Sequence, residues 1–167
     1  MFPTTADGVK LHGWHIPGPS PDVVWLIFHG NGGNISVRMN QYQEIHRRYG
    51  GSILAIDYRG YGRSEGLPSE GGFYADALAA RMLATELHPA RFSATKHVAN
   101  LPVPTLVIHG DSNRTVSPAN AERIFGAASD PKQLEIVPGG DHEGLDLVEP
   151  ERYHLVLTDF LRKYDAL

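Results

Sequence analysis

The chain has 167 residues, with 15 Lys and Arg against 19 Asp and Glu, so its formal net charge is −4 with nine neutral histidines. At this length we expect one domain that buries roughly 68–70% of the surface of the unfolded chain. The mild acidity argues against a nucleic-acid partner, and no apolar run reaches the roughly 20 residues that span a bilayer. The sequence has no cysteine, which excludes disulfides and cysteine catalysis and fits a cytoplasmic location.

The first part of the chain alternates between strand and helix patterns. Residues 9–16 alternate in polarity with a phase shift at Gly13, which predicts an edge strand with a bulge. Residues 23–28 are apolar throughout, as is typical of a strand covered on both faces, and residues 52–58 predict a second buried strand. Between them, apolar residues recur at steps of three and four over residues 35–49, which predicts an amphipathic helix.

A second helix is predicted from Ser69, its candidate N-cap, to about Leu87. This helix carries one apolar ridge that we expect to face the core, formed by Tyr74, Leu78 and Met82. Residues 88–102 have weak periodicity, which predicts a connector.

The last part of the chain repeats the alternation. Residues 105–109 predict a third buried strand, and Pro118 opens a helix at its first position. The core face of this helix is predicted to consist of Ala121, Ile124, Phe125 and Ala128. Residues 133–137 predict a strand, residues 138–148 a loop and residues 151–164 a final helix.

Strands that alternate with helices predict an α/β fold, with a mostly parallel sheet of about five strands and helices on both faces. Ligands of such folds bind outside the carboxyl ends of the strands. Glycine-rich or polar loops follow predicted strands at residues 29–34, 59–69, 110–117 and 139–147. We therefore expect the functional residues in these loops.

The loops carry four motifs, which are HGNGGN at 29–34, DYRGYGRSEG at 57–66, HGDSNRTV at 109–116 and GGDH at 139–142. In this order and at strand ends they resemble the α/β-hydrolase family, especially its small serine hydrolases and esterases. The resemblance implies a reduced α/β-hydrolase core and a hydrolase that acts on a small ester. His142 matches the triad histidine of the family, and Gly30 and Asn31 match its oxyanion loop.

The chain departs from the family pattern in two respects. The nucleophile elbow, Gly-x-Ser-x-Gly between a strand and a helix, is missing after Leu87, together with about two strand–helix units and the cap. Asn113 stands where the family pattern has the acidic residue of the triad. Its amide oxygen can accept an imidazole N–H but cannot neutralise an imidazolium, a change that costs roughly 10⁴ in turnover in a serine protease triad.

Two serines remain as alternative nucleophiles. Ser64 lies in the only literal Gly-x-Ser-x-Gly of the chain, but not between a strand and a helix. Ser112 would lie at such a turn if the strand at 105–109 paired with the strand at 23–28, in place of the missing strand. Either Asp111 or Asp141 would then orient the catalytic histidine.

Two functions follow from this pattern. The first is a minimal serine hydrolase that acts on small, short-chain esters, with weak activity because it lacks a cap. The second is a catalytically inactive hydrolase-like scaffold that serves in binding or assembly. We expect no cofactor and no metal, because the histidines show no zinc-hydrolase spacing. Exposed sheet edges favour a homodimer.

Overall fold

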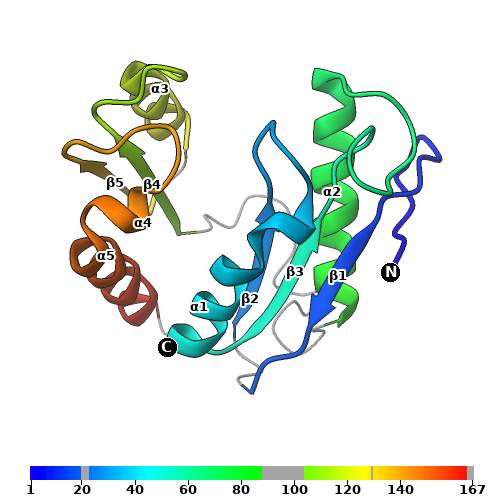
Figure 1. Ribbon diagram of the computed structural model, residues 1–167, viewed down its shortest axis with the longest axis horizontal. Helices are drawn as coiled ribbons and strands as arrows, with labels where there is room; N and C mark the ends of the chain where they lie inside the picture. The colour runs from blue at the N-terminus through cyan, green and yellow to red at the C-terminus, as the bar shows by residue number, and fades with distance from the viewer. Residues whose placement is uncertain (20–22, 88–103, 129, 165–167) are drawn as a thin grey trace. The chain divides into compact units, whose positions relative to one another are not determined.

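The structure is a computed structural model that describes residues 1–19, 23–87, 104–128 and 130–164 (Figure 1). The chain divides into two compact units, Met1–His97 and Val98–Leu167, which we call the N-terminal and C-terminal units. A single domain over residues 1–167 stays a prediction. The connector predicted at 88–102 lies outside the described residues.

The N-terminal unit contains a sheet of strands β1 (Gly13–Ile16), β2 (Val24–Phe28) and β3 (Ser52–Ile56) in the order β1-β3-β2. Strand β2 runs parallel to β3, and β1 runs antiparallel to it with a regular register that starts at Gly13. All five residues of β3 are buried, as the apolar run predicted. The β strand predicted from residue 9 is confirmed only from Gly13 onward, at the edge of the sheet.

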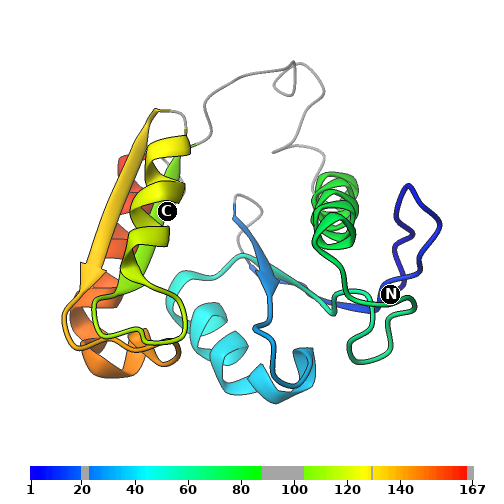
Figure 2. The ribbon, with the colours of Figure 1, turned by 90° about the horizontal axis from the view of Figure 1, so that it is seen from above.

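Helices cover both faces of this sheet (Figure 2), because successive buried side chains of β3 point to opposite faces. Leu54 and Ile56 form a core with alanines of helix α2 (Glu70–Leu87). Ile53 and Ala55 form a second core with residues of the 3₁₀ helix η1 (Ile35–Arg38) and helix α1 (Met39–Tyr49). The predicted α/β architecture is therefore confirmed for this unit.

The ridge predicted to face the core on α2 is wrong. Tyr74, Leu78 and Met82 are 66%, 58% and 65% exposed. The helix instead turns its small side chains toward β3, where the buried ones are Ala79, Ala80 and Ala84. Alanine side chains are small, so they allow the helix backbone to pack close to the sheet.

The C-terminal unit contains two parallel strands, β4 (Thr105–Gly110) and β5 (Lys132–Val137), joined through helix α3 (Pro118–Ala127). Ser117 caps α3 by accepting a hydrogen bond from the amide of Ala119 at 3.4 Å, so the predicted helix start is confirmed. Ala121 is buried, but Ile124 is 58% exposed, against prediction.

Two further helices complete the C-terminal unit. Helix α5 (Pro150–Lys163) matches the predicted final helix. The short helix α4 (Leu145–Val148) occupies the end of the segment predicted as a loop, and Gly144, in the left-handed conformation, begins it. None of the helices in the described ranges is long and apolar enough to cross a membrane.

A buried ion pair joins the loop after β3 to α2. The backbone amide and Nε of Arg59 each donate to the Asp76 carboxylate at 2.9 Å, and Arg59 also makes two hydrogen bonds to Asp7. Arg59 thereby holds the pKa of Asp7 well below its ordinary value. Asp57, two residues before Arg59 in the chain, binds other groups described below.

We predict that Asp76→Ala lowers the free energy of unfolding by about 3–5 kcal/mol, because it leaves a buried guanidinium with one partner fewer. Urea unfolding measures this loss. Glu44→Ala is the matched control, since it removes an exposed pair with Arg47 and should change little. Equal losses in the two variants would contradict the assignment.

Candidate active site

The loops that follow β4 and β5 lie against each other, because parallel strands end at the same edge of a sheet. A Cβ on Gly110 would stand 2.1 Å from the carbonyl oxygen of Gly140, so a side chain is excluded at this crossing. The amide of Ser112 donates to that same oxygen at 2.9 Å. The two glycines therefore allow the HGDSN and GGDH motifs to meet.

Two carboxylates fasten these loops through backbone amides. Asp111 Oδ1 accepts from the amide of Gly139 at 2.8 Å and from the Ser112 hydroxyl at 2.9 Å. Asp141 Oδ1 accepts from the amide of His142 at 2.7 Å and from that of Arg114 at 3.4 Å. Within the described part of the chain, neither carboxylate hydrogen-bonds to the His142 ring.

Asn113 lies in the centre of the two loops and is 9% exposed. Its Oδ1 accepts from the amides of Thr115 at 3.0 Å and Val116 at 2.8 Å. Its Nδ2 lies 3.4 Å from His142 Nδ1 and 3.3 Å from His109 Nε2. The amide oxygen thus binds the backbone, and the side of Asn113 that faces His142 is its NH₂ group.

In the N-terminal unit, the predicted oxyanion loop is exposed at Gly30 and Asn31. The buried ring of His29 donates from Nδ1 to the carbonyl of Gly30 at 2.6 Å, and the Tyr61 hydroxyl donates to Asn31 Oδ1 at 2.6 Å. The Arg38 guanidinium lies beside Gly30, where it adds positive charge to the loop. These contacts give the loop a defined conformation.

The end of this loop is anchored on Asp57, a role that the sequence analysis missed. Asp57 is 1% exposed, and its carboxylate accepts from the amide of Ile35 at 2.8 Å and from His12 Nδ1 at 2.9 Å. Burial, and secondarily the charge of Asp57, raises the pKa of Tyr42 to about 12. A carboxylate directly after the apolar run of residues 53–56 was the signal in the sequence that pointed to this anchor.

Ser64 is engaged in holding the loop of residues 57–66. Its hydroxyl donates to the carbonyl of Asp57 at 2.7 Å and accepts from the amide of His12 at 2.8 Å. A Cβ on Gly62 would stand 2.1 Å from the Asp57 carboxylate, so packing against Asp57 explains the first glycine of this Gly-x-Ser-x-Gly. These contacts favour a structural role for Ser64.

The structure therefore divides the predicted site residues between its two units. Five of them gather in the two loops of the C-terminal unit, namely Asp111, Ser112, Asn113, Asp141 and His142. Gly30, Asn31 and Ser64 lie in the N-terminal unit. Among the residues that the structure describes, no cluster of histidine and carboxylate side chains is suited to hold a metal ion.

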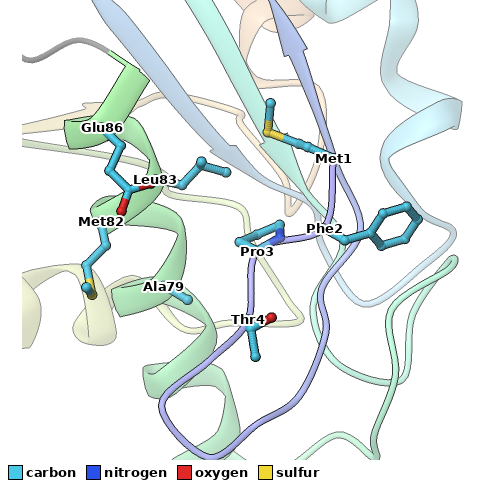
Figure 3. Close-up of a pocket in the computed structure, with 8 residues that line it drawn as sticks. All are labelled: Met1, Phe2, Pro3, Thr4, Ala79, Met82, Leu83 and Glu86. Carbon is cyan, nitrogen blue, oxygen red and sulfur yellow. The ribbon is translucent and has the colours of Figure 1, made fainter.

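A separate pocket of about 320 Å³ lies in the N-terminal unit, between the N-terminal segment and α2 (Figure 3). Pro3 lies on one side of this pocket, and Ala79 and Leu83 lie on the other. Its lining contains none of the candidate catalytic residues.

Comparison with curated proteins finds distant relatives over most of the chain. A Mycobacterium tuberculosis protein named as uncharacterised is 28% identical, over 96% of this chain and 76% of its own length. That alignment runs over 221 positions, 54 more than the 167 residues of the chain, so the relative carries at least that many residues without a counterpart here. The YfhR protein of Escherichia coli is 24% identical, over 83% of this chain and 71% of its own length. The chain matches no protein-family profile.

Solved structures of hydrolases have the same fold. An esterase from Pyrococcus furiosus matches with a TM-score of 0.75 at 17% identity, over 98% of this chain and 89% of the esterase. An α/β serine hydrolase without lid from Xanthomonas campestris matches with a TM-score of 0.64 at 18% identity, over 98% and 93% of the two chains. The expected α/β-hydrolase-like fold is therefore confirmed.

We predict that Ser64→Ala lowers the free energy of unfolding by about 1–3 kcal/mol, because it leaves the Asp57 carbonyl and the His12 amide without their partner. Ser112→Ala is the matched control, since its hydroxyl is exposed and donates to the carboxylate of Asp111. Thermal unfolding measures the loss of stability in each of the two variants. A larger loss in Ser112→Ala would contradict the structural role of Ser64.

Proposed function

Because the chain has the fold of the α/β hydrolases, we propose that it is a hydrolase with weak carboxylesterase activity on small, short-chain esters. The observation that carries this proposal is the gathering of a histidine, a serine and two carboxylates in one pair of loops of the C-terminal unit. Fold alone does not determine function, so the proposal rests on these side chains.

Ser112 is the preferred nucleophile in this proposal. Its hydroxyl is exposed, and its loop is bound directly to the loop that carries His142. The Ser112 oxygen attacks the ester carbonyl carbon while its proton passes to His142 Nε2. The same proton then goes to the departing alcohol as the ester bond breaks, and water hydrolyses the acyl-serine by the reverse transfers. Ser64 is the alternative nucleophile, but its hydroxyl already binds two backbone groups.

The remaining roles follow the family resemblance. Gly30 and Asn31 stay the predicted oxyanion loop of the resemblance. Asp111 or Asp141 would stabilise the protonated His142, although each now binds backbone amides. The proposal predicts slow turnover because, among the residues that the structure describes, neither carboxylate hydrogen-bonds to the His142 ring.

The second candidate is a catalytically inactive scaffold that binds a partner. It is favoured by one observation, the uncharged Asn113 at the position where the family has its acid. A cytoplasmic location, a homodimer, and the absence of a nucleic-acid or membrane partner stay predictions under either candidate, as does the absence of a cofactor.

We predict that the chain hydrolyses p-nitrophenyl acetate, and that Ser112→Ala and His142→Ala each reduce the rate by about tenfold or more. Ser64→Ala, measured at a temperature where it stays folded, should retain the wild-type rate. The release of p-nitrophenol measures the rate of hydrolysis by the wild type and by each of the three variants. Equal rates in all of them would reject the proposed esterase.

A fluorophosphonate probe separates the two candidates without depending on the choice of substrate. The esterase predicts covalent labelling of one serine, Ser112, because an activated serine attacks phosphorus as it attacks a carbonyl. Peptide mapping by mass spectrometry locates the label. An unlabelled, folded chain would favour the inactive scaffold.

A further inference from the structure

We propose that Asn113 is a positioning residue that holds neutral His142 with its proton on Nε2, which is the tautomer opposite to the one that a general base needs. The tautomer follows from the hydrogen bonds of Asn113 itself. Its effect on ester hydrolysis rests on the proposed function.

The first step is the orientation of the amide. Asn113 Oδ1 lies within 3.0 Å of the backbone amides of Thr115 and Val116, both of which can only donate. If the amide were turned around, its NH₂ group would face these two N–H groups, and two hydrogen bonds would be lost in a buried place. The oxygen must therefore face the backbone, and the NH₂ group must face the histidines.

The second step is the state of the two rings. His109 Nδ1 lies 2.8 Å from the carbonyl of Gly110, which can only accept, so Nδ1 carries the proton and the neutral ring leaves Nε2 bare. His109 Nε2 accepts one hydrogen of the Asn113 NH₂ group. The second hydrogen points to His142 Nδ1, which must also be bare in order to accept it. All four hydrogen-bonding positions of the amide are then used.

The consequence for His142 concerns its other ring nitrogen, Nε2. With Nδ1 bare, the single proton of the neutral ring lies on Nε2, so this nitrogen donates and cannot take up the proton of a serine. A second proton would have to enter at Nδ1, opposite the amide N–H of Asn113. The reactive tautomer is therefore a minority species, which gives a physical reason for slow turnover.

Asn113→Asp reverses this arrangement with a nearly isosteric side chain. One carboxylate oxygen can keep the hydrogen bonds from the amides of Thr115 and Val116, and the other replaces the NH₂ group and accepts a hydrogen bond from the Nδ1–H of His142. His109 keeps its Nδ1–H on the Gly110 carbonyl, and its Nε2 can donate to the new carboxylate once the ring takes up a second proton. Asn120→Asp adds the same charge in the first turn of α3, in the same unit, and is the matched control.

The test has a readout that does not depend on activity. Long-range ¹H–¹⁵N spectra of the labelled full chain distinguish protonated from bare imidazole nitrogens, and His142→Gln identifies the signals of His142. We expect the wild type and Asn120→Asp to show the proton on Nε2, and Asn113→Asp to show it on Nδ1. A wild-type ring protonated on Nδ1 alone, or an unchanged tautomer in Asn113→Asp, would overturn the proposal.

Hydrolysis of p-nitrophenyl acetate then tests the catalytic consequence. Asn113→Asp should raise the rate by about tenfold or more, within the roughly 10⁴ that the reverse change costs a serine protease. Asn120→Asp should leave the rate unchanged. If the spectra show the tautomer switch but no variant hydrolyses the ester, the proposed esterase fails while the tautomer assignment stands. If the wild type is active and the switch leaves its rate unchanged, the catalytic role of Asn113 is rejected.

Discussion

The chemistry of the C-terminal unit depends on one buried amide whose four hydrogen-bonding positions all have partners. The oxygen of Asn113 stabilises the turn that leads into α3, and its nitrogen bridges His109 and His142. A buried polar group with no free position cannot turn without losing hydrogen bonds, so it fixes its neighbours as well. The same amide therefore acts in local structure and in the protonation of the candidate base.

This network requires the backbones of two loops to lie close together. Gly110 and Gly140 allow that approach, and the carboxylates of Asp111 and Asp141 secure it by binding backbone amides of both loops. The N-terminal unit uses a similar device, because buried Asp57 fixes the end of the loop that contains Gly30. The carboxylates of these loops thus have a structural role, because they hold in place the loops in which the catalytic candidates lie.

The sequence predicted the elements better than their orientation. The apolar runs at β2, β3 and β4 and the helix start at Pro118 were clear because periodicity and capping are local properties. The face of α2 was predicted wrongly, since the choice between Tyr74, Leu78 and Met82 and the alanines depends on how closely the helix approaches β3. Nor could the sequence show that the Asn113 oxygen binds the backbone, because that bond depends on the turn geometry.

The central claim is that Asn113 presents N–H groups, and no acceptor, to His142. Neutron diffraction from crystals of the full chain in D₂O tests it most directly, because deuterium positions are observed on side-chain nitrogens. The account predicts deuterium on Nε2 of His142 and an Asn113 amide whose two deuterium atoms point to the two imidazole rings. Deuterium on Nδ1 of His142, with the amide oxygen of Asn113 accepting it, would contradict the account.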